Sequence, residues 1–186
     1  VSLVPDVSVD IPYDESVEMV VSALQPLGTE YTTTLRGGLL GGWVDRYENK
    51  GKRSGAFSAG SYQGDPYILM NYKNDTLRDT FTLAHEAGHS MHSWYSVRNN
   101  PFQHYGYTIF EAEVASTFNE QLLLHNLLAQ KPDSRMHAYL VNKSIDDMIG
   151  TLFRQTMFAE YERTLHERVE AGEPLTVDRF REIYRE

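Results

Sequence analysis

The sequence predicts a mainly α-helical protein of the α+β class with one small β-sheet. Apolar residues recur at three- and four-residue steps, and the stretches 71–100 and 133–171 contain no proline. Two short runs typical of strands lie between residues 54 and 72. With 186 residues and 41% hydrophobic content, the chain can bury one substantial core, so we expect a single domain.

The first expected element is a helix near residues 14–24. Asp14 can cap this helix at its start, and Pro26 ends or kinks it. Its apolar face consists of Val17, Val20, Val21 and Leu24. We assign this region to the scaffold.

A glycine-rich run follows at residues 37–42. It lacks the G-x-G-x-x-G spacing of a dinucleotide site, and no lysine with serine or threonine follows it as in a phosphate-binding loop. We therefore reject nucleotide binding. The run is expected to be either the turn that ends a helix or a mobile loop.

Residues 54–60 and 67–72 read as two short strands separated by the turn signal at residues 63–66. A small sheet is expected beside the helices that follow. Gly55 and Gly60 would permit close backbone approach to the edge of such a sheet. The alternative is an ordinary hairpin whose glycines serve turns.

The most informative motif is His85-Glu86-Ala87-Gly88-His89, which has the pattern H-E-x-x-H. Residues at helical spacing surround it: Phe81, Ala84, Gly88, Met91 and Tyr95. The motif is therefore predicted to lie on a helix. Residues four apart on a helix share one face with about 6 Å of rise, so His85 and His89 can reach a single ion.

This is the layout of a zinc peptidase. Two histidines hold Zn²⁺, and Glu86 takes a proton from the water that attacks a peptide carbonyl. The predicted architecture is thus a zincin-like metallopeptidase catalytic core with a small β-sheet beside the metal-binding helices. The two-histidine, one-glutamate donor set also suits manganese or cobalt, and availability decides among such ions.

A zinc site of this kind needs a third protein ligand. The candidates are His92, His104, Glu111, Glu113 and Glu120. His92 lies about 10 Å along the helix from His85, too far for a shared ion, so packing or support of a ligand is expected for it. A helical hairpin that turns near Pro101 brings residues close to Glu113 level with the metal.

Glu111 and Glu113 differ by about 200° around a helix, so only one can face inward. Glu113 shares a stripe with Thr117 and Glu120 beside the apolar positions, and we select it as the ligand. Glu111 is expected to be a solvated first-turn residue. For Glu120 two roles stay open, a hydrogen bond from a metal-binding imidazole or an ion pair with Arg78.

Two segments carry a family resemblance. Residues 85–93, HEAGHSMHS, and residues 107–119, YTIFEAEVASTFN, resemble the thimet-type oligopeptidases of the M3 family, most closely the oligoendopeptidase F branch. The runs at residues 42–57 and 66–72 add support. The resemblance implies that His85, His89 and Glu113 are zinc ligands and that Glu86 is the catalytic base. It also implies that the exposed edge of the small sheet receives an extended substrate.

The helical pattern of residues 177–186, which Thr176 can cap, continues to the last residue, and Val1 is not an initiator methionine. We expect a fragment of the catalytic domain. In the family that it resembles, a helical N-terminal region precedes this segment, and a C-terminal segment that carries a histidine and several tyrosines follows it. The favoured function is a zinc-dependent endopeptidase acting on oligopeptides. The alternative is a catalytically incompetent metal- or peptide-binding fragment.

Other features are assigned less specific roles. Residues 133–171 should form one long helix or two in tandem. Tyr105 and Tyr107 could contact substrate, although packing is the commoner role of such tyrosines. The remaining histidines are expected to be surface residues or ordinary packing residues: His125, His137 and His166.

Composition sets broad limits on the partners. The chain has no cysteine, and no apolar stretch is long enough to span a bilayer, so we expect a soluble, cytoplasmic protein without a membrane partner. A net charge of −9 argues against nucleic acid and is compatible with oligopeptide substrates. The oligomeric state cannot be inferred.

Overall fold

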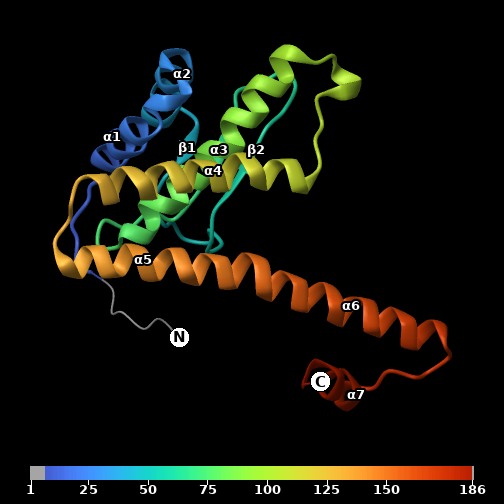
Figure 1. Cartoon of the computed structure of the whole chain (residues 1–186). Coiled ribbons are helices and arrows are strands. Elements are labelled where there is room, and N and C mark those ends of the chain that lie inside the picture. The colour runs from blue at the N-terminus through green and yellow to red at the C-terminus, as the bar shows by residue number, and fades with distance from the viewer. Residues whose placement is uncertain (1–6, 186) are drawn as a thin grey trace. The chain divides into compact units, whose positions relative to one another are not determined.

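A computed structural model describes residues 7–185 (Figure 1). Their contacts divide them into two compact units, residues 7–139 and residues 140–185, and the boundary falls inside the helix at Ser134–Met148. Most described residues are helical, and three short strands form one sheet. The predicted mainly α fold with a small sheet is confirmed.

The larger unit begins with α1 (Tyr13–Ala23) and α2 (Thr29–Leu40), joined by a 3₁₀ turn at Gln25–Leu27 that contains Pro26. The apolar face predicted for α1 is buried. The prediction that Asp14 caps α1 was wrong. The helix begins at Tyr13, with Pro12 at the cap position two residues before Asp14. Asp14 lies in the first turn, where its negative charge interacts favourably with the helix dipole.

The glycine-rich run ends α2, as one of the two alternatives predicted. The helix continues through Gly37 and Gly38 and stops at Gly41. The ring of Trp43 lies directly on Gly38, where a Cβ atom would come within 2.2 Å of the ring. Gly38 is therefore required for this contact. The contact lies where the chain passes from α2 to β1 of the sheet.

The sheet has the order β1-β3-β2, formed by β1 (Val44–Asp45), β2 (Phe57–Ala59) and β3 (Tyr67–Leu69). β1 is parallel to β3, whereas β2 is antiparallel to β3 with Ser58 opposite Ile68. The two predicted strands are present but shorter than expected. β1 was not predicted, because two residues are too few for an alternating pattern.

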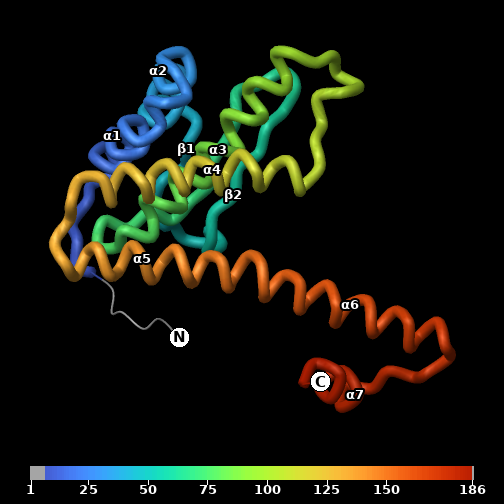
Figure 2. Tube along the Cα trace, viewed as in Figure 1, coloured from blue at the N-terminus to red at the C-terminus, as the bar shows by residue number. Residues whose placement is uncertain are grey.

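Helices α3 (Leu77–Asn99) and α4 (Ile109–Ala129) make the most extensive helix contact of the larger unit (Figures 1 and 2). The H-E-x-x-H motif lies in the middle of α3, as predicted. The expected helical hairpin is present, and its second helix begins at Ile109. Thr108 caps α4, and its hydroxyl and backbone N–H both donate to Glu111 Oε2, at 2.7 and 2.8 Å.

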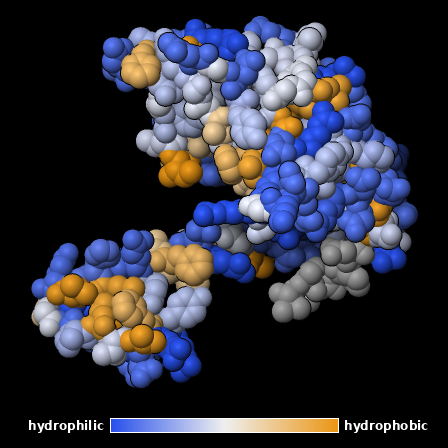
Figure 3. Space-filling view, turned by 180° about the vertical axis from the view of Figure 1, so that it is seen from behind, coloured by the Kyte–Doolittle hydropathy of each residue, from blue (hydrophilic) through white to orange (hydrophobic). Residues whose placement is uncertain are grey.

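The chain continues through α5 (Ser134–Met148), a π-helical turn (Ile149–Phe153) and α6 (Arg154–Glu170). The expected tandem helices are thus joined by a π turn. In the smaller unit, α7 (Val177–Arg185) follows Thr176, whose hydroxyl accepts a hydrogen bond from the Arg179 N–H at 3.3 Å. Figure 3 shows hydrophobic side chains gathered on the surface of this unit. Within residues 7–185, no helix combines the length and apolar character needed to cross a membrane.

Candidate metal centre

His85 and His89 project from the same face of α3, one turn apart. Their Nε2 atoms lie 3.1 Å from each other, and both side chains are partly buried. Two unprotonated nitrogens at this distance repel one another unless a proton or a cation lies between them. The pair is therefore placed to share a proton or a cation.

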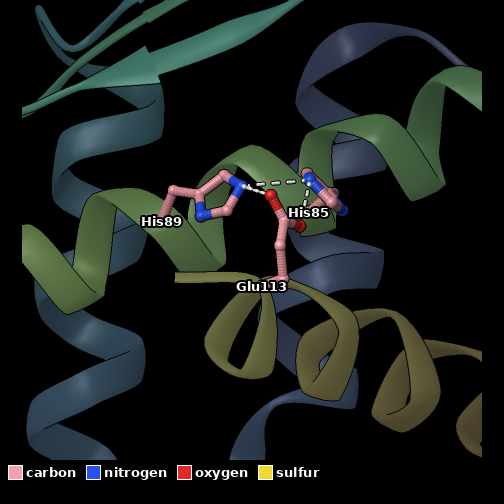
Figure 4. A group of neighbouring side chains, drawn as sticks. All are labelled: His85, His89 and Glu113. Atoms are coloured by element: carbon pink, nitrogen blue, oxygen red, sulfur yellow. Dashed lines mark hydrogen bonds and ion pairs between the residues drawn. The ribbon is translucent and has the colours of Figure 1, made fainter. Parts of the chain in front are cut away.

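Glu113 reaches this pair from α4 (Figure 4). Its Oε2 lies 3.5 Å from His85 Nε2, and its Oε1 lies 3.7 Å from His89 Nε2. Donors bound tetrahedrally at 2.0–2.1 Å are separated by about 3.3 Å, close to these distances. Among the described residues, these three form the one group of side chains placed to hold a metal ion. The donor set thus fits a small divalent ion.

The orientation of the two imidazoles is fixed by their other ring nitrogens. His85 Nδ1 donates to Glu120 Oε1 at 2.6 Å, which leaves Nε2 as an acceptor. Burial lowers the pKa of His85, but the hydrogen bond and charge of Glu120 outweigh burial and leave the pKa raised. Burial lowers the pKa of His89, which also bonds to the backbone of Ala112. Of the two roles left open for Glu120, the structure shows the contact with the imidazole.

Glu86 is buried beside this group, with 6% of its surface exposed. Burial raises its pKa to about 7. The positive charge of His85 opposes this rise, and the carboxylates of Glu113 and Glu120 reinforce it. The carboxylate accepts a hydrogen bond from the backbone of Ser58, yet Oε2 is buried and has no partner among the described residues. An unpaired buried carboxylate oxygen is costly, so this atom is suited to a proton or a bound water.

Two residues of α4 that sequence reasoning did not select support Glu113. The Ser116 hydroxyl, fully buried, donates to Glu113 Oε2 at 3.0 Å, and the Thr117 hydroxyl donates to the Glu113 carbonyl at 2.6 Å. The buried Asn119 side chain donates to Ala84 O at 3.2 Å and so ties α4 to α3. The sequence feature that could have identified these residues is the placement of small polar residues on the face of α4 that points inward.

Strand β2 lies along α3 close to the motif. The hydroxyls of Ser58 and Ser90 are 2.8 Å apart, and a Cβ atom on Gly60 would come within 2.5 Å of Ser93 Cβ. Gly60 therefore permits the chain that follows β2 to lie close to α3, whereas the approach of an extended ligand to this edge stays a prediction. Gly55 has a φ of +99° and open space around it, so it serves a turn.

The remaining candidates lie outside the ligand group. His92 stacks on the ring of Tyr107 with centroids 3.8 Å apart. The hydroxyls of Tyr107 and Ser93 are hydrogen-bonded to each other. Tyr105 packs on Tyr62, at 5.2 Å between ring centroids. These contacts are packing contacts. His104 lies in an exposed 3₁₀ turn, Glu111 belongs to the α4 cap, and three histidines are exposed: His125, His137 and His166.

Comparison with known proteins identifies the family of the chain. A family model described as Peptidase family M3 matches residues 14–186. An oligoendopeptidase F homolog of Borreliella burgdorferi is 56% identical over 173 residues, which cover 92% of this chain and 29% of the relative. Oligopeptidase PepF of Bacillus subtilis is 46% identical over 182 residues, which cover 98% of this chain and 27% of the relative. The chain thus spans less than a third of these relatives.

Solved structures of similar proteins support the same family. A Chlamydophila abortus protein assigned as a peptidase is 42% identical, with a TM-score of 0.79 over 97% of this chain and 30% of that one. Oligoendopeptidase-F of Enterococcus faecium is 32% identical, with a TM-score of 0.54 over 91% of this chain and 22% of that one. The resemblance to the oligoendopeptidase F branch is confirmed. With the family model matching nearly its whole length, this chain belongs to peptidase family M3.

Proposed function

We propose that the chain carries the catalytic centre of a zinc-dependent endopeptidase that hydrolyses peptide bonds in oligopeptides. The observation that carries this proposal is the buried, unpaired Oε2 of Glu86 beside the group formed by His85, His89 and Glu113. Relatives named as oligoendopeptidases support the substrate class. Zinc is chosen because two imidazoles and one carboxylate are a common donor set of catalytic zinc.

His85, His89 and Glu113 would hold the ion, which leaves a fourth position open. When bound, zinc supplies Lewis-acid chemistry, polarising the peptide carbonyl and lowering the pKa of the attacking water. Glu120 holds His85 in the tautomer that presents Nε2 to the ion. The protein thus contributes a fixed ligand geometry, set by two helices and one supporting carboxylate.

Glu86 acts as the general base in this proposal. Its Oε2 accepts the proton released by the attacking water, and the same oxygen returns the proton to the leaving amine. A carboxylate with a pKa raised to about 7 is suited to both transfers near neutral pH. The backbone hydrogen bond from Ser58 restrains the carboxylate in this position.

The exposed edge of β2 is the proposed site for the substrate backbone. β2 is an edge strand, bonded to β3 on one side, and it lies along α3 beside the motif. An extended peptide that added a strand to this edge would pass Glu86, to which the Ser58 backbone already donates. The close contact of Gly60 with Ser93 keeps this edge near α3.

The alternative proposal is a metal- or peptide-binding segment that is incompetent for catalysis on its own. The observation in its favour is the coverage, because the chain spans only 29% of the Borreliella burgdorferi relative. Groups that stabilise the transition state could lie in the remainder of such proteins. The cytoplasmic location, the assignment of the chain to one partial catalytic domain and the exclusion of nucleic acid stay predictions from the sequence.

Metal analysis combined with a cleavage assay tests the proposal. Zinc content and hydrolysis of a quenched-fluorescence oligopeptide are measured on the chain and on Glu86→Gln. We expect about one zinc per chain in both, with cleavage only in the parent. Stoichiometric zinc without cleavage in the parent would favour the alternative. Absence of zinc from the parent would refute both the zinc site and the peptidase mechanism.

A further inference from the structure

The backbones of α3 and α4 lie close together at Gly88, inside the H-E-x-x-H motif. Gly88 is buried, and a Cβ atom built on it would lie 2.6 Å from Ser116 Cα and 2.7 Å from Ala115 O. Both neighbours are backbone atoms of α4. No side-chain rotation can relieve such a contact, so a larger residue at position 88 must move one helix relative to the other.

The required movement can be estimated. Carbon atoms in contact are separated by at least about 3.5 Å, so an alanine at position 88 would displace α4 by about 1 Å. Glycine in a helix interior otherwise costs about 1 kcal/mol relative to alanine. Helix propensity therefore gives no reason for glycine at this position, whereas the contact with α4 does.

The contact point is adjacent to the third ligand. Ser116 lies one turn after Glu113 on the same face of α4, and its hydroxyl donates to Glu113 Oε2 at 3.0 Å. The Glu113 carboxylate lies 3.5 Å from His85 Nε2 on one side and 3.7 Å from His89 Nε2 on the other. A shift of α4 away from α3 withdraws this carboxylate from both imidazoles.

We propose that Gly88 is a positioning residue, whose lack of a side chain sets the helix spacing at which Glu113 completes the metal site. This inference rests on the proposed function, since it assumes that Glu113 and the two histidines bind one ion. It assigns a role to a motif position that touches neither the ion nor the substrate. Gly88 acts only through α4 and the reach of Glu113.

The test compares zinc affinity, measured by competition with a chromophoric chelator, and the absorption spectrum of bound cobalt(II) in the full chain. Gly88→Ala should lower zinc affinity roughly 10- to 100-fold, the range seen for residues that orient ligands. Its cobalt spectrum should match that of Glu113→Ala. The matched control is Gly37→Ala, because Gly37 is a helical glycine of α2 with open space around it. The control should change neither quantity.

A double variant separates this role from general destabilisation. If Gly88 acts through Glu113, adding Gly88→Ala to Glu113→Ala should lower zinc affinity no further. An additive loss would overturn the inference, as would a Gly88→Ala chain with parental affinity and cobalt spectrum. Far-UV circular dichroism of the metal-free chains reports whether each variant folds.

A third variant covers the case in which Gly88→Ala does not fold. Glu113→Asp withdraws the carboxylate by one methylene and leaves the helix contact intact, so it should also lower zinc affinity at least tenfold. Unchanged affinity in Glu113→Asp would overturn the inference. Zinc binding would then tolerate a carboxylate drawn back by a full methylene, which is more than the shift of about 1 Å expected for Gly88→Ala. A parent chain that binds neither metal would refute the proposed function itself, and this inference with it.

Discussion

Glu120 accepts a 2.6 Å hydrogen bond from Nδ1 of His85, across the interface between α4 and α3. The two residues are 35 positions apart in the sequence. The bond determines which nitrogen of the imidazole carries the proton and therefore which nitrogen faces Glu113 and His89. A carboxylate that does not touch the candidate ion thus decides whether His85 can act as a ligand.

Replacing Glu120 should therefore weaken metal binding in a graded manner. Glu120→Ala should lower zinc affinity roughly 10- to 100-fold, since the imidazole loses its acceptor. Glu120→Gln keeps an acceptor oxygen without the charge and should show a smaller loss. Isothermal competition titration measures both, with the exposed Glu162→Gln as the control. Equal affinities for Glu120→Ala and the parent would contradict the prediction.

Ser116→Ala should weaken metal binding more modestly. The Ser116 hydroxyl lies 3.0 Å from Glu113 Oε2 and 3.1 Å from the Glu113 carbonyl oxygen, and the variant removes both contacts. Loss of the contact with the carboxylate is worth about 1 kcal/mol or roughly fivefold in affinity. Thr117→Ala is a matched control, because Thr117 bonds the backbone carbonyl of Glu113 and not its carboxylate. Zinc competition should show the loss for Ser116→Ala alone. A loss of the same size in both variants would show that the hydroxyl acts on the helix and not on the ligand.

Zinc should stabilise the folded chain. At a free zinc concentration of about 100 times the dissociation constant, the free energy of unfolding should rise by roughly 2.7 kcal/mol. Thermal unfolding followed by circular dichroism measures this as a higher Tm, which EDTA should reverse. His89→Ala should show no such rise. The site assignment would be in error if His89→Ala gained as much stability from zinc as the parent.

Thr108→Ala should destabilise the fold without altering the donor set directly. The variant removes both the hydroxyl that caps α4 and its contact with Glu111, at a cost of about 1 kcal/mol. Urea unfolding of the metal-free chain measures the change. Thr33→Ala replaces an exposed threonine within α2 and should leave stability within about 0.5 kcal/mol. A parental unfolding midpoint for Thr108→Ala would show that the cap contributes nothing to folding.

The parts of the fold that depend on local pattern could be predicted from the sequence. The motif helix was recognised from its periodic apolar residues and its stop at Pro101, and the return of the chain to Glu113 followed from helix geometry. These inferences use only rise per residue and helical phase. The buried face of α1 and the cap at Thr176 are further examples.

The parts that depend on a distant partner could not be predicted. Gly88 looks like one more small residue of an apolar stripe until the backbone of α4 is known to lie against it. The choice between two partners for Glu120 also required the helix crossing. β1 exists only because β3 pairs with it, and its two residues carry no pattern of their own. The cap of α1 was misplaced because Pro12 gave no side-chain signal.

The donor atoms of the candidate metal centre have a consequence for ion selection. Donor atoms only 3.1 to 3.7 Å apart match bonds of about 2 Å. Calcium prefers six to eight oxygen donors at about 2.3–2.6 Å, and magnesium retains most of its hydration shell. The two nitrogen donors therefore disfavour both of these abundant, oxygen-preferring ions, so the donor chemistry itself contributes to ion selection.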